Sequence, residues 1–129
     1  MAQVKIYGVK ENLSVTKVQL SETIHECIVD VLAFPQDKKF HRFIALDRAD
    51  FIFPDDKSDE YIIIEIMMMQ GRSAEVKKAL IHALFNNIVQ VLKITSNDIE
   101  ICIVESPTCN WGFRGETGDE IQLNYTVKV

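Results

Sequence analysis

The chain repeats its apolar pattern at a spacing of 60 residues, and this repeat limits the possible folds more than any other feature of the sequence. The segment VLAF at 31–34 recurs as VLKI at 91–94. The same spacing relates three further apolar pairs: Leu20 with Leu80, Ile24 with Leu84, and Ile28 with Ile88. Self-similarity at a fixed period indicates a duplicated structural unit. We therefore predict one domain over residues 1–129, with internal pseudo-repeats at about 3–50 and 61–113.

Each half is predicted to contain a strand, a helix and a second strand. Short alternating or apolar runs predict strands at 4–9, 40–46, 61–69 and 99–105. Helical spacing predicts a first helix from an N-cap Ser14 to Pro35, with a buried face of Val18, Ile24, Cys27, Ile28, Val31 and Leu32. A second helix is predicted after an N-cap Ser73, with a buried face of Val76, Leu80, Leu84, Ile88, Val91 and Leu92.

The predicted architecture is an α+β fold, an α/β sandwich of one sheet and one helix layer. Each β-α-β unit places two parallel strands beneath one right-handed crossover helix, so two units give a four-stranded sheet with two helices on one face. A glycine-rich hairpin at 110–120 and an alternating strand at 120–129 complete the chain. The other face of the sheet is apolar in places and needs burial, which favours a symmetric oligomer. We expect the last strand to add to the sheet of a neighbouring subunit.

Composition excludes several classes of partner. The net charge is −5 and the 14 Lys and Arg residues are scattered, which argues against binding of nucleic acid or of an anionic membrane. The three cysteines lack CxxC spacing, which favours a reduced, cytoplasmic protein. The three histidines form no ligand-spaced group with them, so we expect no metal. The start of the chain lacks the apolar region of a signal peptide, and the apolar run at 61–69 is less than half a membrane span.

One arginine, Arg72, lies between the predicted buried strand at 61–69 and the start of the second helix. A guanidinium beside a helix N-terminus adds bidentate pairing to a field that already favours anions, so Arg72 is a candidate carboxylate-binding residue. The alternative is a helix-start arginine that lies in water.

Several motifs in order resemble the tautomerase superfamily. They are Gly71-Arg72-Ser73 at the strand–helix junction with a Glu and a Lys one turn later, a strand that ends in Val-Glu, and the hairpin NWGFRGE at 110–116. That superfamily includes 4-oxalocrotonate tautomerase, macrophage migration inhibitory factor and malonate semialdehyde decarboxylase. The resemblance covers nearly the whole chain. It is closest to the decarboxylase branch, which shares the fused halves and the Trp-x-Phe hairpin.

The resemblance implies a homotrimer with its sheets packed into a barrel and a site at each strand terminus. It also implies isomerase chemistry on a small keto, enol or unsaturated carboxylate, without a metal or an organic cofactor. Family members bind the substrate carboxylate with arginines and move protons with an amino-terminal proline. Arg72 matches one such arginine. Gln70 stands where the decarboxylase branch has a second, which weakens the case for decarboxylation.

The chain departs from the family at its start, because Ala2 stands where the family places the catalytic proline. A free α-amine at Ala2 or Met1 could serve in its place, from an unperturbed pKa of about 7.7–8.0. The alternative is a trimeric scaffold or small-ligand-binding protein that has lost the proline chemistry. Met1 stands in the sequence, and its retention favours that alternative.

Further candidates carry open alternatives. Arg42 lies on an apolar strand and therefore needs an anionic partner. This partner is either a structural one (Asp47, Asp50 or a group across a subunit boundary) or a ligand. His41 is expected to be a satisfied core histidine. Asp37 is expected to be a turn residue.

The hairpin supplies the last candidates. Trp111 and Phe113 either wall a small pocket, as their family counterparts do, or pack the hairpin itself. Arg114 is either a second contact for an anion or an exposed residue.

Overall fold

The computed structural model of the chain describes residues 2–121. The main elements are β1 (Ala2–Val9), α1 (Lys10–Leu32), β2 (His41–Leu46), β3 (Ile62–Met69), α2 (Ala74–Leu92) and β4 (Ile99–Ser106). A short hairpin follows, made of β5 (Gly112–Phe113) and β6 (Glu116–Thr117). Single 3₁₀ turns, η1 (Arg48–Asp50), η2 (Ser96–Asp98) and η3 (Thr108–Asn110), lie in the connections.

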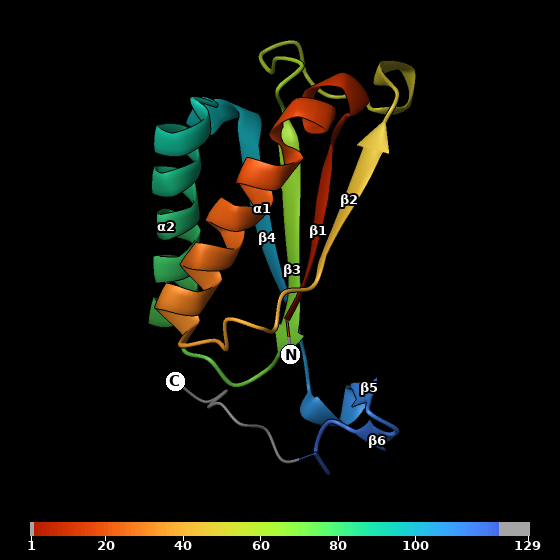
Figure 1. Cartoon of the computed structure of the whole chain (residues 1–129), viewed down its shortest axis with the longest axis vertical. Coiled ribbons are helices and arrows are strands. Elements are labelled where there is room, and N and C mark those ends of the chain that lie inside the picture. Colours follow the sequence, from red (N-terminus) through yellow and green to blue (C-terminus); the bar gives the residue numbers. More distant parts are fainter. Residues whose placement is uncertain (1, 122–129) are drawn as a thin grey trace.

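The four long strands form one mixed sheet in the order β2-β1-β3-β4, with both helices on one face (Figure 1). Within each half the strands are parallel, β1 with β2 and β3 with β4, while β1 and β3 meet antiparallel at the centre. This arrangement confirms the predicted α/β sandwich of two β-α-β units. The predicted strand at 120–129 lies almost entirely outside the described residues.

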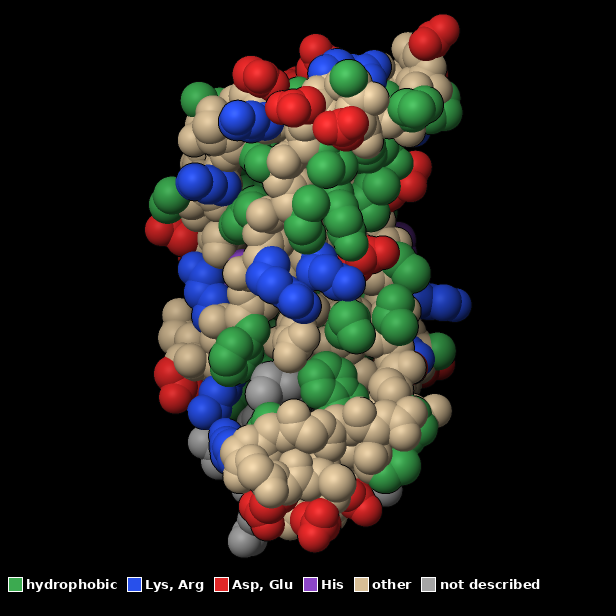
Figure 2. Space-filling view, turned by 90° about the vertical axis from the view of Figure 1, so that its right-hand side faces the viewer, with side chains coloured by type: hydrophobic (Ala, Val, Ile, Leu, Met, Phe, Trp, Pro, Cys, Tyr) green, Lys and Arg blue, Asp and Glu red, His purple; other side chains and the backbone are tan. Residues whose placement is uncertain are grey.

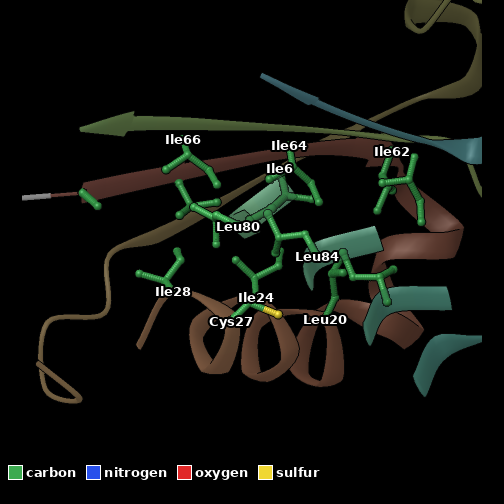
Figure 3. Packing of buried hydrophobic residues seen from close by; sticks show 14 of the residues in the cluster. Ile6, Leu20, Ile24, Cys27, Ile28, Ile62, Ile64, Ile66, Leu80 and Leu84 are labelled. Atoms are coloured by element: carbon green, nitrogen blue, oxygen red, sulfur yellow. The ribbon is translucent and has the colours of Figure 1, made fainter. Parts of the chain in front are cut away.

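The core lies between the sheet and the helix layer. Alternate side chains of β1 and β3 are buried, as expected of strands with one face covered. Ile6 and Ile64 from the sheet point toward Ile24 and Leu84 from the two helices (Figure 3). Each such side chain contributes about 1.5–3 kcal/mol by leaving water. The three apolar pairs that the repeat relates, Leu20 with Leu80, Ile24 with Leu84, and Ile28 with Ile88, are all in this core.

The first helix begins five residues earlier than predicted, with Val9 rather than Ser14 at its N-cap position. It starts at Lys10, directly after β1, and Ser14 lies inside it, where its hydroxyl donates to the carbonyl oxygen of Glu11 at 2.8 Å. The predicted N-cap at Ser14 is therefore wrong. Gly8 permits the abrupt change, because a Cβ at this position would lie 2.8 Å from Cγ of Leu13. No apolar signal marked this start, since the first turn is polar.

Two residues that were predicted to be buried are exposed. Val18 is 68% exposed, although it was predicted to be buried. At 3.6 residues per turn it lies about 140° around the helix from Leu13, on the face away from the sheet. Val91 of α2 is likewise exposed rather than buried.

The second helix begins as predicted. The Ser73 side chain accepts a hydrogen bond from the backbone N–H of Val76 at 3.3 Å, which is the expected N-cap. Both helices end in a left-handed residue, Ala33 with φ 52° and Lys93 with φ 61°. These positions are again 60 residues apart.

Neither α1 nor α2 covers the second face of the sheet. Paired strand positions share a face, so Arg42, Lys5, Glu65 and Cys102 form one transverse row there. On the side of the molecule that carries β2, basic side chains gather at mid-height beside an acidic group, with hydrophobic side chains above and below them (Figure 2). Within residues 2–121, neither α1 nor α2 has the apolar stretch that a helix needs to span a lipid bilayer.

Candidate active site

The start of β1 and the ends of β3 and β4 lie at one end of the sheet, where the hairpin of β5 and β6 also lies (Figure 1). Ala2 at the start of β1 pairs with Met68 near the end of β3. The backbone N–H of Gln70, just after β3, donates to the carbonyl oxygen of Ser106 at the end of β4, at 2.9 Å. The resemblance to the tautomerase superfamily predicts a site at this end of the strands.

Arg72 lies at this end and is buried, with 5% of its surface exposed. Gly71 before it has φ 145°, a conformation that favours glycine and lets the chain turn from β3 toward α2. The Arg72 guanidinium donates through Nη1 to the carbonyl oxygen of Met69 at 3.5 Å. Because the side chain is buried within the protomer, the alternative of a helix-start arginine in water is wrong.

Ala2 is also buried, with 3% of its surface exposed. Its side chain lies on the helix side of the sheet, in the same row as Met68 and Glu105. Met1, the other candidate for the α-amine, lies outside the described residues.

Arg42 lies on the opposite face of the sheet from the helices and is exposed. Its Nη2 donates to Oε1 of Gln3 at 3.2 Å. Within residues 2–121 it forms no ion pair, so the suggested pairing with Asp47 or Asp50 is wrong. Arg42 and Gln3 line a surface hollow of about 410 Å³, together with Lys39, Phe40 and His41. Two cationic side chains border this hollow, which makes its surroundings favourable for an anion.

Glu65 neutralises part of that charge on the same face. Its Oε1 accepts a hydrogen bond from the hydroxyl of Tyr7 at 2.8 Å and lies 3.8 Å from Nζ of Lys5. The hydrogen bond to Glu65 is the main reason why the pKa of Tyr7 is raised. The interruption of an apolar run by one Glu was visible in the sequence, but its partners on β1 were not.

His41, the first residue of β2, has a partner on α1, as predicted for a satisfied histidine, but it is half-buried and does not lie in the core. Its Nδ1 lies 2.7 Å from Oγ of Ser21, and its ring meets that of His25 edge-on at 5.9 Å. Burial, followed by the neighbouring Lys39 and His25, lowers the pKa of His41 to about 4. The ring is therefore neutral at physiological pH. Asp37 lies in a turn, as predicted.

The hairpin brings its aromatic residues to the same end of the molecule. Trp111 and Phe113 are half-buried, and Arg114 is exposed with φ 57°, its guanidinium 5.5 Å from the centre of the Phe113 ring. Phe113 borders a hollow of about 390 Å³, with Glu116, Thr117 and Glu120. Arg114 therefore caps the hairpin and does not enter the core.

The sequence did not identify one further pair at this end. Lys77 of α2 and Glu105 of β4 form an ion pair with 2.6 Å between Nζ and Oε1. Both residues belonged to the motifs described above, but their spacing of 28 residues gave no sign that they meet. Across residues 2–121, no group of three or more His, Cys, Asp or Glu side chains is arranged to hold a metal ion.

Solved structures share this fold. A native fused 4-OT aligns with a TM-score of 0.83 at 19% identity, over 92% of this chain and 98% of that one. Malonate semialdehyde decarboxylase aligns with a TM-score of 0.78 at 17% identity, over 88% of this chain and 92% of that one. Another fused 4-OT, which aligns with a TM-score of 0.78 at 19% identity over 92% of this chain and 97% of that one, is an asymmetric trimer.

Curated relatives agree with these structures. A probable tautomerase of Bacillus subtilis (strain 168), YusQ, is 26% identical over 100 residues, which are 74% of this chain and 79% of that protein. A 2-hydroxymuconate tautomerase of Comamonas testosteroni is 33% identical over 57 residues, which are 44% of this chain and 90% of that protein. Residues 38–114 match the sequence profile of the family described as tautomerase enzyme. This match covers more than half of the chain, which therefore belongs to the tautomerase family.

Proposed function

We propose that this protein is a cofactor-independent isomerase that moves a proton between the keto and enol forms of a small carboxylic acid. The observation that carries the proposal is the buried guanidinium of Arg72, at the end of the sheet where residue 2 also lies. A guanidinium beside the N-terminus of a helix lies in a field that favours anions, and a substrate carboxylate matches its bidentate geometry. The curated relative that acts on 2-hydroxymuconate supports a substrate of this class.

We assign the remaining roles from the resemblance to the tautomerase superfamily. The α-amine of Ala2 or Met1 transfers the proton, or a water bound there does so. Arg42 and Arg114 are secondary contacts for the anionic substrate, and Trp111 and Phe113 form apolar walls. Keto–enol transfer needs only one group that accepts and returns a proton, so these side chains suffice for the chemistry.

Turnover of phenylenolpyruvate and of 2-hydroxymuconate tests the proposal. Arg72→Ala should lower kcat/KM by about 10- to 100-fold, the range expected when a charged hydrogen bond is lost. Arg72→Lys, which keeps the charge but loses the bidentate fork, should fall between Arg72→Ala and the unmodified protein. Arg48→Ala is the matched control, because Arg48 is an exposed arginine that pairs with Asp59 through side chains 50% and 75% exposed.

The outcome is decisive when each variant is shown to be folded by circular dichroism. Equal turnover by the wild type and Arg72→Ala would refute the assignment of Arg72. No turnover above buffer by the wild type would refute the isomerase.

We propose in addition that the active form is a homotrimer, as in the fused 4-OT described as a trimer. The partly apolar second face of the sheet supports this assembly. Light scattering at micromolar protein should give a mass three times the 14.8 kDa of one chain. A stable monomer would refute it. Deletion of residues 120–129 should weaken assembly more than it weakens folding of the protomer.

A catalytically silent scaffold is the second candidate, and Ala2 in place of the family's proline favours it. Ala2→Pro separates the two. An isomerase that depends on an α-amine at this position should gain activity, provided that intact mass shows removal of Met1. A scaffold that has also lost the rest of its site should stay inactive.

A further inference from the structure

Trp111 is fixed on both sides by backbone hydrogen bonds. Its N–H donates to the carbonyl oxygen of Thr108 at 3.1 Å, and its own carbonyl oxygen accepts from the N–H of Gly118 at 2.7 Å. Gly118 is buried, and a Cβ there would lie 3.1 Å from Cβ of Trp111 and 2.9 Å from Cε of Met69. Trp111 and Met69 therefore both adjoin Gly118, and Met69 is the residue whose carbonyl oxygen accepts from Arg72.

The ring nitrogen of Trp111 is buried, and no acceptor within residues 2–121 lies within hydrogen-bonding distance of it. An indole N–H can only donate. Leaving such a donor buried without an acceptor destabilises a protein by about 1–3 kcal/mol, and almost all buried polar groups in proteins have a partner. A tryptophan that served only as an apolar wall would gain nothing from this nitrogen, because phenylalanine would form the wall without the cost.

We propose that the indole N–H of Trp111 donates a hydrogen bond to the keto or enol oxygen of the bound acid. This proposal rests on the proposed function and gives Trp111 a role beyond a wall. Arg72 carries a full positive charge and suits the carboxylate, whereas the neutral N–H suits the less charged oxygen at the reacting carbon. Trp111 makes and breaks no covalent bond. Its hydrogen bond strengthens as negative charge develops on that oxygen during proton transfer.

The consequence is selectivity for acids that carry an oxygen beside the carboxylate. A site with a buried donor discriminates against a ligand that leaves this donor unpaired. Phenylpyruvate and 3-phenylpropionate provide the comparison, because they share the ring and the carboxylate and differ in the keto oxygen.

Trp111 is the only tryptophan of the chain, so a ¹H–¹⁵N spectrum of the full-length protein contains one indole N–H signal. Saturating phenylpyruvate should move this signal downfield, as a new hydrogen bond requires, while 3-phenylpropionate should leave it near its position in the free protein. The measurement uses the unmodified protein and needs no variant to fold.

Affinities measured by calorimetry complete the test. Trp111→Phe, which keeps an aromatic ring but removes the donor, should weaken phenylpyruvate about five- to tenfold and leave 3-phenylpropionate within about twofold. Phe113→Leu is the control, because it alters an aromatic side chain that has no donor and should affect both ligands alike.

The proposal fails if both ligands move the indole signal equally, or if Trp111→Phe weakens the affinity for both ligands equally. Trp111 would then serve only as an apolar side of the pocket. The same holds if an ordered water satisfies the nitrogen and phenylpyruvate leaves the signal unmoved. If neither ligand binds and the protein shows no turnover, the proposed function itself fails, and the selectivity with it.

Discussion

The ammonium group of Lys77 lies 2.6 Å from Oε1 of Glu105, and this ion pair joins α2 to the end of β4. The exposed fractions of the two side chains are 28% and 18%. Glu105 pairs across the sheet with Met68, which in turn pairs with Ala2. The ion pair therefore holds α2, and the Arg72 that precedes it, against the strand ends of the candidate site.

Loss of either partner should destabilise the protein. Lys77→Met leaves the largely buried carboxylate of Glu105 without its cation, and Glu105→Gln leaves the ammonium group of Lys77 without its anion. Each substitution should therefore lower the free energy of unfolding by about 1–3 kcal/mol. The double variant should lose about 1 kcal/mol less than the sum of the two. Urea unfolding at one fixed protein concentration measures these values.

The exposed pair between Arg48 and Asp59 is the control for that cycle, with a distance of 3.0 Å. Its coupling energy should be about 0–1 kcal/mol, as for surface ion pairs in general. Equal coupling in the two cycles would contradict the role assigned to Lys77 and Glu105.

Gly118→Ala should distort the hairpin. The added Cβ would lie 2.4 Å from the carbonyl oxygen of Thr108, and backbone cannot yield as a flexible side chain does. We expect a loss of about 1–3 kcal/mol, as for overpacking elsewhere, together with a change in the fluorescence of Trp111. Gly112→Ala is the control, because its nearest neighbour is 3.9 Å away. Similar thermal midpoints for both variants would show that the hairpin is not tightly packed at Gly118.

His41 should make the protein sensitive to acid. Its pKa is about 4 in the folded protein and 6.5 in the absence of burial, so the unfolded chain takes up the proton first as the pH falls. The contribution of the neutral His41 ring to the free energy of unfolding is therefore complete above pH 6.5. It is lost as the pH falls from 6.5 to about 4. For a ring that keeps part of its contact with water, the loss should be about 1–2 kcal/mol.

The measurement is the difference in urea midpoint between the wild type and His41→Gln, taken from pH 7.5 to 4. The variant should lose less stability over this interval, because glutamine does not titrate. The carboxylates titrate in both proteins, so their effect cancels in the difference between the two midpoints. Parallel pH profiles would exclude His41 as the cause.

Cys27 should resist thiol reagents until the protein unfolds. The side chain is buried in the core, and burial raises the pKa of its thiol to about 11, so little thiolate exists at pH 8. In a variant with Cys102→Ala and Cys109→Ala, Ellman's reagent should react with no thiol in the native state and with one after addition of denaturant. Rapid reaction in the native state would show that the core opens around α1.

The wild type adds a readout of assembly to this experiment. Cys109 and Cys102 are both exposed in the protomer, and Cys102 lies on the face of the sheet that the helices leave uncovered. If this face packs in a trimer, Cys102 should react more slowly than Cys109. Equal rates would argue against burial of the face.

The strands and helices could be predicted because their signals are local. The apolar alternation of β1 and β3 and the capping serine of α2 lie within a few residues of the structure that they specify. The start of α1 was missed for the same reason, because its first turn is polar and Val9 before it makes no side-chain cap. There the position of the helix is set by packing of Leu13 against Gly8, which no local pattern records.

Three features could be read from the amino-acid order alone: the repeated β-α-β frame, the arginine at the strand–helix junction and the absence of proline at residue 2. Three others became visible in the folded chain: Arg72 is buried, Ala2 lies opposite Met68, and Lys77 meets Glu105. The physical reason is the range of the forces involved. Periodicity and capping act between neighbours in the chain, whereas burial and ion pairing depend on which distant segments the folded sheet and helices bring together.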